Sequence, residues 1–128
     1  MRAIRKTAAI TVVLAATCMA CVARAGEVEI VAADFHHRGS NHWSVNVTLR
    51  HGDSGWDHYA DNWRIEDGEG NLLGERVLYH PHVDEQPFTR ALADVVIAPQ
   101  IETVYVVAHD TQHGWSSQRM RVDIANLR

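Results

Sequence analysis

The chain has few cysteines, one lysine and no long apolar run, and each of these shortages excludes a class of protein. Both cysteines, Cys18 and Cys21, lie near the N-terminus, so the residues beyond them offer no disulfide framework and no thiolate metal site. The apolar stretch at residues 8–20 is shorter than the roughly 20 residues of a membrane-spanning helix. Acidic residues outnumber basic ones by 16 to 12, which argues against a nucleic-acid partner. With 128 residues, the chain has the size of one domain.

The first 25 residues follow the order of a secretory signal peptide. Three basic residues lie within Met1–Lys6, the apolar stretch follows, and Ala23-Arg24-Ala25 supplies the small residues that a signal peptidase recognises. We therefore predict Sec-type export to the periplasm, removal of residues 1–25, and a single domain at 26–128 with no transmembrane segment. Cys21 raises the alternative of lipoprotein anchoring, which is less favoured because Cys18 replaces the expected upstream leucine.

Nine histidines are the most unusual feature of the remaining chain. Four of the twelve basic residues and none of the sixteen acidic ones lie in the predicted signal peptide, so the formal charge moves from −4 to −8 on its removal. All nine histidines stay. Because imidazole titrates between about pH 5 and 8, a pH-dependent association is one hypothesis for them.

Alternation of apolar and polar residues predicts an all-β domain. In the clearest strand, Trp43, Val45, Val47 and Leu49 share one face. We expect about seven strands, at 27–33, 43–50, 62–66, 72–79, 88–97, 103–109 and 118–124. This spacing is typical of an antiparallel β-sandwich of immunoglobulin or fibronectin III type, and a small β-barrel is the alternative.

Antiparallel strands place alternate connections at opposite ends of a sandwich. The predicted loops 51–61, 80–87 and 110–117 then share one end, and loops on a rigid sandwich are where binding sites usually lie. Six of the nine histidines fall in or beside these loops: His51, His58, His80, His82, His109 and His113. The other three lie in the predicted loop 34–42 at the opposite end: His36, His37 and His42.

The most specific local pattern is His80-Pro81-His82, because proline stiffens a segment whose two imidazoles can reach one metal ion. His109 and His113, four residues apart across a turn, form a natural second pair. These four are the predicted ligands, and His51, His58 and Asp57 are held in reserve. Neutral imidazole suits zinc or copper(II), with Asp53, Asp57 or Asp110 as oxygen ligands or acceptors. The alternative is that the histidines bond loop backbone or lie on the surface.

No catalytic machinery is defined by the sequence. Gly52-Asp53-Ser54-Gly55 matches the nucleophile loop of trypsin-like proteases over four residues, but that fold needs about twice this length, so the segment is interpreted as a turn. Trp56 and Trp115 are expected to cap the core rather than to stack on a ligand. We predict a non-enzymatic periplasmic binding module for a metal, with an unidentified protein or small ligand as partner. The alternative is a structural or protein-interaction domain without metal, which responds to pH through its histidines.

Three segments of the chain resemble a group of small uncharacterised exported proteins of proteobacteria. They are residues 55–63 (GWDHYADNW), residues 80–88 (HPHVDEQPF) and His113-Gly114-Trp115. The resemblance covers essentially all of residues 26–128. It implies an exported, bacterial, single-domain β protein, and it carries no activity or functional residues.

Overall fold

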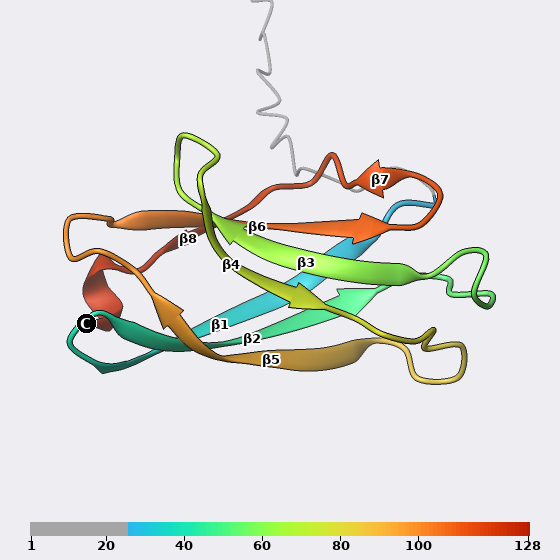
Figure 1. The fold of residues 1–128 in the computed structure, drawn as a ribbon, viewed down its shortest axis with the longest axis horizontal. Helices are drawn as coiled ribbons and strands as arrows, with labels where there is room; N and C mark the ends of the chain where they lie inside the picture. Colours follow the sequence, from blue (N-terminus) through green and yellow to red (C-terminus); the bar gives the residue numbers. More distant parts are fainter. Residues whose placement is uncertain (1–25) are drawn as a thin grey trace, which may run out of the picture.

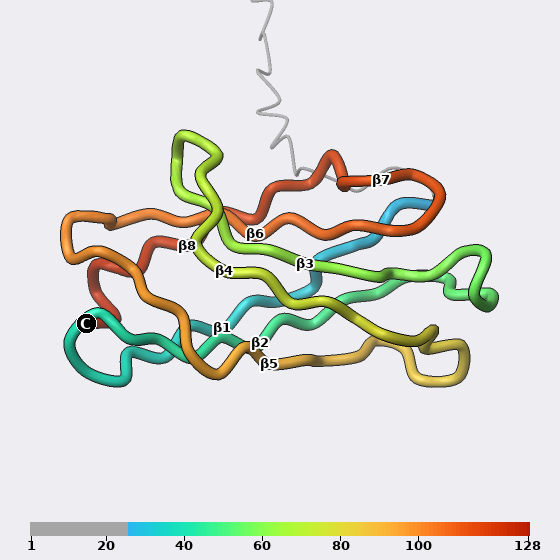
Figure 2. Tube along the Cα trace, viewed as in Figure 1, coloured from blue at the N-terminus to red at the C-terminus, as the bar shows by residue number. Residues whose placement is uncertain are grey.

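The chain folds into two antiparallel β-sheets that pack face to face (Figures 1 and 2). The computed structural model describes residues 26–128, so the predicted signal peptide and Cys21 lie outside the described residues. Three strands form the first sheet in the order β1–β2–β5: β1 (Glu29–Gly39), β2 (His42–Arg50) and β5 (Phe88–Val96).

The second sheet has five strands and lies over the first. Its path is β4 (Leu72–Val77), β3 (Ala60–Glu66), β6 (Thr103–Asp110) and β7 (Gly114–Trp115), and β8 (Met120–Asp123) also pairs with β6. A short 3-10 helix, Ala125–Leu127, follows β8. The predicted all-β sandwich is confirmed, with eight strands instead of about seven. In the part of the chain that the structure describes, no helix has the length and hydropathy to cross a membrane.

The hydrophobic core lies between the sheets and follows the predicted alternation. In β2, the side chains of Trp43, Val45, Val47 and Leu49 are fully buried. Burying an aliphatic side chain of this size stabilises the fold by about 1.5–3 kcal/mol. Among the described residues, the cluster of buried core residues begins at Val28 and ends at Ile124.

Gly74 in β4 allows a close approach between the two sheets. A Cβ atom at this position would lie 3.0 Å from Cδ2 of Leu92 and 3.3 Å from both Cγ atoms of Val95, which belong to β5. These distances are shorter than an ordinary carbon–carbon contact of about 3.5–4.0 Å. The glycine that weakens the sequence pattern of this strand is therefore explained by packing.

The first strand is longer than the sequence predicts. We expected a strand at 27–33 followed by a loop at 34–42, but β1 continues to Gly39 and pairs with β2 along its length. The chain reverses in a tight turn in which Gly39 and Ser40 have φ angles of 106° and 50°. The prediction of a long loop is wrong because the alternation continues through Phe35, which is buried. His36 and His37 consequently lie on a strand.

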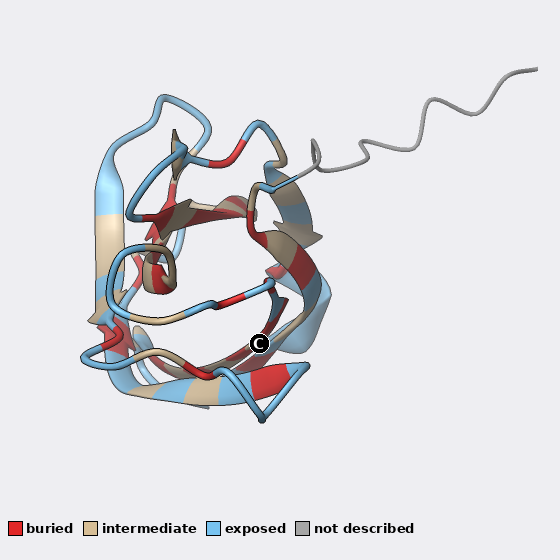
Figure 3. Ribbon diagram, turned by 90° about the vertical axis from the view of Figure 1, so that its right-hand side faces the viewer, coloured by how far each residue is buried: buried red, intermediate tan, exposed pale blue. Residues whose placement is uncertain are grey.

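Since every strand pair is antiparallel, successive connections alternate between the two ends of the sandwich. The connections 51–59, 78–87 and 111–113 lie together at one end, on the right in Figure 1, beside Gly26 at the start of the described chain. Figure 3 looks onto this end and shows buried segments among its exposed loops. The prediction that these three loops share one end is confirmed, and we call it the histidine end.

Candidate metal centre

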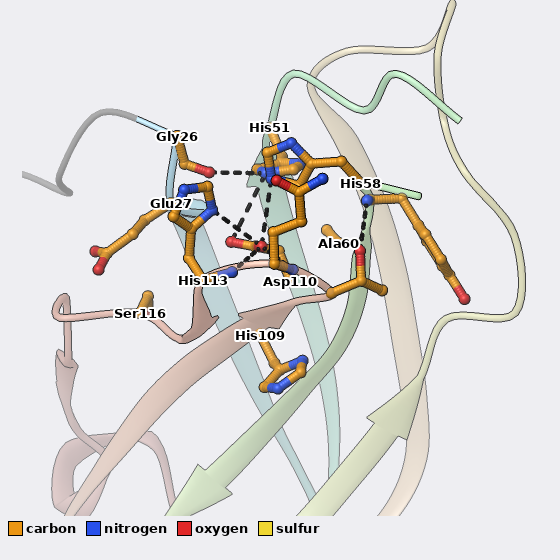
Figure 4. Close-up of polar contacts among 12 residues, drawn as sticks. Gly26, Glu27, His51, His58, Ala60, His109, Asp110, His113 and Ser116 are labelled. Atoms are coloured by element: carbon orange, nitrogen blue, oxygen red, sulfur yellow. Dashed lines mark hydrogen bonds and ion pairs between the residues drawn. The ribbon is translucent and has the colours of Figure 1, made fainter. Parts of the chain in front are cut away.

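Three side chains at the histidine end bring metal-ligand atoms together. His51 directly follows β2, His58 lies in the loop between β2 and β3, and Asp110 ends β6. One ligand atom from each lies within 4.8 Å of those from the other two (Figure 4). Within residues 26–128, this is the one group of three or more histidine, cysteine, aspartate or glutamate side chains at such distances. We call it the His–Asp cluster.

Asp110 is fully buried and holds the turn between β6 and β7. Its Oδ1 atom accepts hydrogen bonds from the backbone N–H groups of Gln112 (2.9 Å) and His113 (2.7 Å). Burial alone would raise the pKa of the Asp110 carboxyl, but the hydrogen bonds from His113 and Gln112 outweigh burial and lower this pKa below its ordinary value. Asp110 is therefore a carboxylate at neutral pH, which is the form that binds metal ions.

His51 is buried between two carboxylates. Its Nδ1 atom lies 2.5 Å from Oδ1 of Asp53, while its Nε2 atom lies 3.0 Å from the carbonyl oxygen of Gly26 and 3.8 Å from Oδ2 of Asp110. In the neutral tautomer whose Nδ1–H donates to Asp53, Nε2 has a lone pair available for a metal ion, whereas a hydrogen bond to the carbonyl of Gly26 needs a proton on Nε2. A carboxylate on the far ring nitrogen is the usual way to orient a metal-binding histidine.

Asp53 is fixed by bonds to three parts of the chain. Besides contacting His51, its Oδ1 atom accepts the N–H group of Ala60 at 3.0 Å, and its Oδ2 atom accepts the N–H group of His82 at 2.8 Å. The Asp53 side chain is fully buried. It therefore joins the loops 51–59 and 78–87 to the start of β3, and it positions His51 from within the protein itself.

His58 completes the cluster, and two buried atoms are left without partners. Its Nε2 atom lies 3.3 Å from Oδ1 of Asp110 without forming a hydrogen bond. Within residues 26–128, neither this nitrogen nor Oδ2 of Asp110 has a hydrogen-bond partner. Leaving a buried polar atom unpaired costs about 1–3 kcal/mol.

The spacing of these atoms fits a transition-metal ion. Tetrahedral ligands at 2.0–2.2 Å from zinc lie about 3.3–3.6 Å from one another. Nε2 of His58 lies 3.3 Å from Oδ1 of Asp110, and Nε2 of His51 lies 3.8 Å from Oδ2, so each histidine is close to this range for a different oxygen of the carboxylate. The His–Asp cluster can therefore hold one divalent metal ion, and two imidazoles with a carboxylate are suitable donors for it.

A tight turn places His58 in the cluster. The N–H group of Ser54 donates to the carbonyl of His58 at 3.0 Å, and the N–H group of His58 donates to the carbonyl of Gly55 at 3.2 Å. Gly55 has a φ of 147°, a conformation that favours glycine. The turn spans residues 55–58, so of the segment 52–55 that we interpreted as a turn only Gly55 takes part in it.

His113 borders the cluster on its more exposed side. Its Nδ1 atom lies 3.1 Å from Oδ1 of Asp110, and its ring centroid lies 5.0 Å from that of His58. The side chain is 38% exposed. His113 is one of the four predicted ligands, and from this position it can bind an ion or donate to Asp110.

The other three predicted ligands lie elsewhere at the same end. His109 points away from Asp110 across β6, because neighbouring residues of a strand face opposite sides, and its Nδ1 atom lies 2.5 Å from Oδ1 of Asp61 (Figure 4). His80 is exposed, and its Nδ1 atom contacts the carbonyl of Pro81 at 3.2 Å.

His82 is buried and engaged with other groups. Its ring stacks on Phe88 with centroids 4.0 Å apart, and its Nε2 atom lies 2.9 Å from Nη2 of Arg90. Because a guanidinium only donates, Nε2 of His82 accepts, and its lone pair is already used. Burial first, and then Arg90, lower the pKa of His82 below its ordinary value.

The structure thus does not bring the four predicted histidines together, and that ligand set stays a prediction. It brings together two of the reserve ligands, His51 and His58, with Asp110 as the oxygen donor. The third reserve, Asp57, is exposed, and its backbone carbonyl accepts hydrogen bonds from Thr111 and Gln112.

Strand parity is the sequence signal that identifies the cluster. In β2, every second side chain faces the core, and the next position in this alternation is His51. The core-facing residues are Trp43, Val45, Val47 and Leu49. In β6, the buried side runs through Val104, Val106 and Ala108 to Asp110, which leaves His109 on the other face. Histidine spacing within loops favoured His109 over Asp110, because it did not take account of the strand that precedes them.

Neither loop tryptophan caps the core. Trp56 is 68% exposed and contacts Tyr59 edge to face, with ring centroids 5.7 Å apart. Trp115 lies on the outer side of the second sheet, where the guanidinium of Arg64 lies 3.9 Å from its ring centroid. The capping interpretation is wrong, because the core is closed at this end by the buried polar groups around Asp53 and Asp110.

An open cavity of about 250 Å³ adjoins the His–Asp cluster. His51 and His58 line it, whereas Asp110 is buried behind them. The remaining lining residues are Gly26, Glu27, Glu29, Arg50 and Gly52. An ion held by the cluster would therefore have its free coordination positions directed toward this cavity.

Comparison with known proteins finds one relevant likeness. A protein of Halomicrobium mukohataei, described as "Putative lipoprotein", is 39% identical over 98 residues. The alignment covers 76% of this chain and 47% of that relative, so the chain spans about half the relative's length. No family profile matches the chain. No solved structure matches it either. The similarity is to a distant archaeal protein, and the resemblance to proteobacterial exported proteins stays a prediction.

Proposed function

We propose that this protein is an exported β-sandwich binding module that coordinates a divalent transition-metal ion through His51, His58 and Asp110. The observation that carries the proposal is the pair of buried atoms without hydrogen-bond partners, Nε2 of His58 and Oδ2 of Asp110, beside Nε2 of His51. A metal ion gives each of these atoms a partner. Zinc and copper(II) both suit imidazole nitrogen combined with carboxylate oxygen.

We propose binding and not catalysis as the role of this site. Ser54 is exposed, and its hydroxyl makes no hydrogen bond to any histidine within residues 26–128. A nucleophilic serine is normally activated by such a bond to a neighbouring base. The serine beside the cluster therefore serves the turn that carries His58.

The test is metal retention by purified protein that comprises residues 26–128. After dialysis against Zn²⁺ or Cu²⁺ and removal of free metal, we expect about one bound equivalent by mass spectrometry, and less than about 0.2 for His58→Ala and Asp110→Asn. The matched control is the double variant His80→Ala with His109→Ala, which removes two histidines outside the cluster and should bind normally. A wild-type value below about 0.2 equivalents, or loss of metal in the control alone, overturns the proposal.

A second candidate function is a structural or protein-interaction domain that needs no metal. It is favoured by His51, whose two ring nitrogens face oxygen acceptors, Oδ1 of Asp53 at 2.5 Å and the carbonyl of Gly26 at 3.0 Å. A ring with a proton on each nitrogen donates to both acceptors, so both contacts of His51 are satisfied without an ion. On this reading, zinc leaves the unfolding temperature of the protein unchanged.

We also propose that export ends in cleavage before Gly26. The small residues Ala23 and Ala25 support this site. The description of the archaeal relative as a lipoprotein supports the alternative, lipid attachment at Cys21. The intact mass of the exported protein decides between them, because one form begins at Gly26 and the other carries acyl chains on Cys21.

A further inference from the structure

We propose that removal of the signal peptide creates an additional metal ligand, the α-amino nitrogen of Gly26. This inference rests on the proposed metal site and extends it, because it names a ligand that exists only in the processed protein. The site is then complete only after export, and the unprocessed precursor binds the ion less tightly.

Gly26 lies close to two histidines, His51 of the His–Asp cluster and His113 beside it. Its carbonyl oxygen lies 3.0 Å from Nε2 of His51, the atom that we assign to the metal. A Cβ atom at Gly26 would lie 2.9 Å from Cε1 and 3.0 Å from Nε2 of His113. Gly26 therefore lies between the rings of two histidines, and Figure 4 shows its carbonyl directed at His51.

The cavity places Gly26 on the open side of the cluster. Gly26, His51 and His58 all line it, while Asp110 lies behind. An ion bound to His51, His58 and Asp110 has its remaining positions on the cavity side. The backbone of Gly26 therefore borders the free coordination positions of this ion.

The folded protein fixes Gly26 there by the residues that follow it. The carboxylate of Glu27 accepts hydrogen bonds from the N–H group and the hydroxyl of Ser117, at 3.0 and 2.7 Å. Val28 and Ile30 are buried in the core. The chain is therefore anchored immediately after Gly26, which holds this residue near the cluster.

Cleavage changes the chemistry of the Gly26 nitrogen. Hydrolysis of the Ala25–Gly26 peptide bond by a signal peptidase consumes one water molecule and leaves a carboxylate on Ala25 and an amine on Gly26. An amide nitrogen shares its lone pair with the carbonyl and is a poor ligand, whereas a neutral amine is a good one for zinc and copper(II). The amine and the carbonyl oxygen of one residue can also bind the same ion in a small chelate ring.

The absence of a side chain at this position fits the same role. Any other residue would direct a Cβ atom against the ring of His113 at 2.9 Å, which requires one of the two groups to move. Gly26 can approach the histidines without this clash. Glycine as the first residue after the predicted cleavage site is therefore compatible with a main-chain ligand at this point.

The experiment compares two forms that both contain the whole core. One begins at Gly26, and the other begins at Val22, so that its Gly26 nitrogen is an amide. Copper(II) affinity is measured for each by competition with a chelator. We expect the longer form to bind at least about tenfold more weakly, since loss of even an outer-shell partner of a metal site costs about 10–100-fold. Circular dichroism verifies that both forms are folded.

A second measurement identifies the ligand atom. Both forms are labelled with ¹⁵N-glycine and loaded with copper(II), and electron paramagnetic resonance then detects labelled nitrogen bound to the ion. We expect this coupling in the form that begins at Gly26 and none in the longer form. The other seven of the eight glycines remain amides in both forms, so they act as an internal control.

Three results would contradict the proposals, and each contradicts a different one: the Gly26 ligand, the metal site or the cleavage site. Equal copper affinity of the two forms, without glycine coupling, overturns the Gly26 ligand and leaves the His–Asp cluster intact. Absence of copper binding in both forms overturns the proposed metal function itself. An exported protein whose first residue is not Gly26 overturns the processing step, because Gly26 then stays an amide.

Discussion

The Nε2 atom of His58 lies 3.3 Å from Oδ1 of Asp110, although the two residues reach this point from different parts of the sandwich. His58 belongs to the loop that leaves the first sheet, and Asp110 ends β6 in the second sheet. Nε2 of His51, which directly follows β2, lies 3.8 Å from the other oxygen of Asp110. An ion in this position connects the two sheets at the histidine end, so metal binding and fold stability should be coupled.

The first prediction concerns this coupling. Zinc added at about 100 times its dissociation constant should raise the free energy of unfolding by about 2.7 kcal/mol, because the ion binds the folded protein. Urea unfolding followed by tryptophan fluorescence measures the change. The variant Asp110→Asn should show no zinc effect, and the same increase in that variant would mean that zinc binds elsewhere.

The second prediction concerns Asp110 without metal. In the presence of a chelator, Asp110→Ala should lower the free energy of unfolding by about 1–3 kcal/mol, because the backbone N–H groups of Gln112 and His113 lose their acceptor. Asp123→Ala is the matched control. Asp123 is exposed, and solvent screens its bonds to Thr103 and Arg121, so this variant should lose little stability. Similar losses in both variants would contradict a structural role for Asp110.

The third prediction concerns the contact between the sheets. Gly74→Ala should destabilise the protein by about 1–3 kcal/mol, since the added methyl group meets Leu92 and Val95 in the core. Gly68→Ala is the control, because nothing lies within 4 Å of a Cβ atom there. Chemical denaturation of the two variants measures the difference. A Gly74→Ala variant as stable as Gly68→Ala would show that β4 does not pack on β5 as described.

The fourth prediction concerns the pH dependence that His82 produces. Burial and Arg90 lower its folded-state pKa, so the folded protein binds fewer protons at His82 than the unfolded chain does. The stability from this group is complete above its ordinary pKa of about 6.5 and is lost as the pH falls through the folded-state pKa. Between about pH 7.5 and about pH 5.5, the wild type should therefore lose more stability than His82→Gln, in chelator throughout. Equal losses in both proteins would show that His82 is not held neutral.

Alternation alone was enough to predict much of the fold. The apolar positions of β2 determine a buried face, and turn residues such as Gly68 and Gly70 separate the strands. The length of β1 was underestimated because His36 and His37 resemble a polar loop. In the structure, both residues lie in β1, because this strand stays paired with β2. The local sequence gives no sign of that pairing.

The location of the candidate site was predicted, but its members were named only as secondary candidates, His51 and His58 in reserve and Asp110 as one of three possible oxygen donors. The sequence located the histidines at one end, because antiparallel order depends only on the number of strands. It did not show that Arg90 occupies Nε2 of His82, or that Asp53 joins His51 to the loop 78–87. Those contacts depend on how the loops fold against one another. Strand parity, however, does identify His51 and Asp110, and it was the stronger signal.

The most direct test of the metal site is a crystal of residues 26–128 soaked in zinc, with diffraction recorded on both sides of the zinc absorption edge. We predict one anomalous peak about 2.0–2.2 Å from Nε2 of His51, Nε2 of His58 and a carboxylate oxygen of Asp110. A fully soaked crystal with no peak at this position, or with its peak between His80 and His82, would contradict the account.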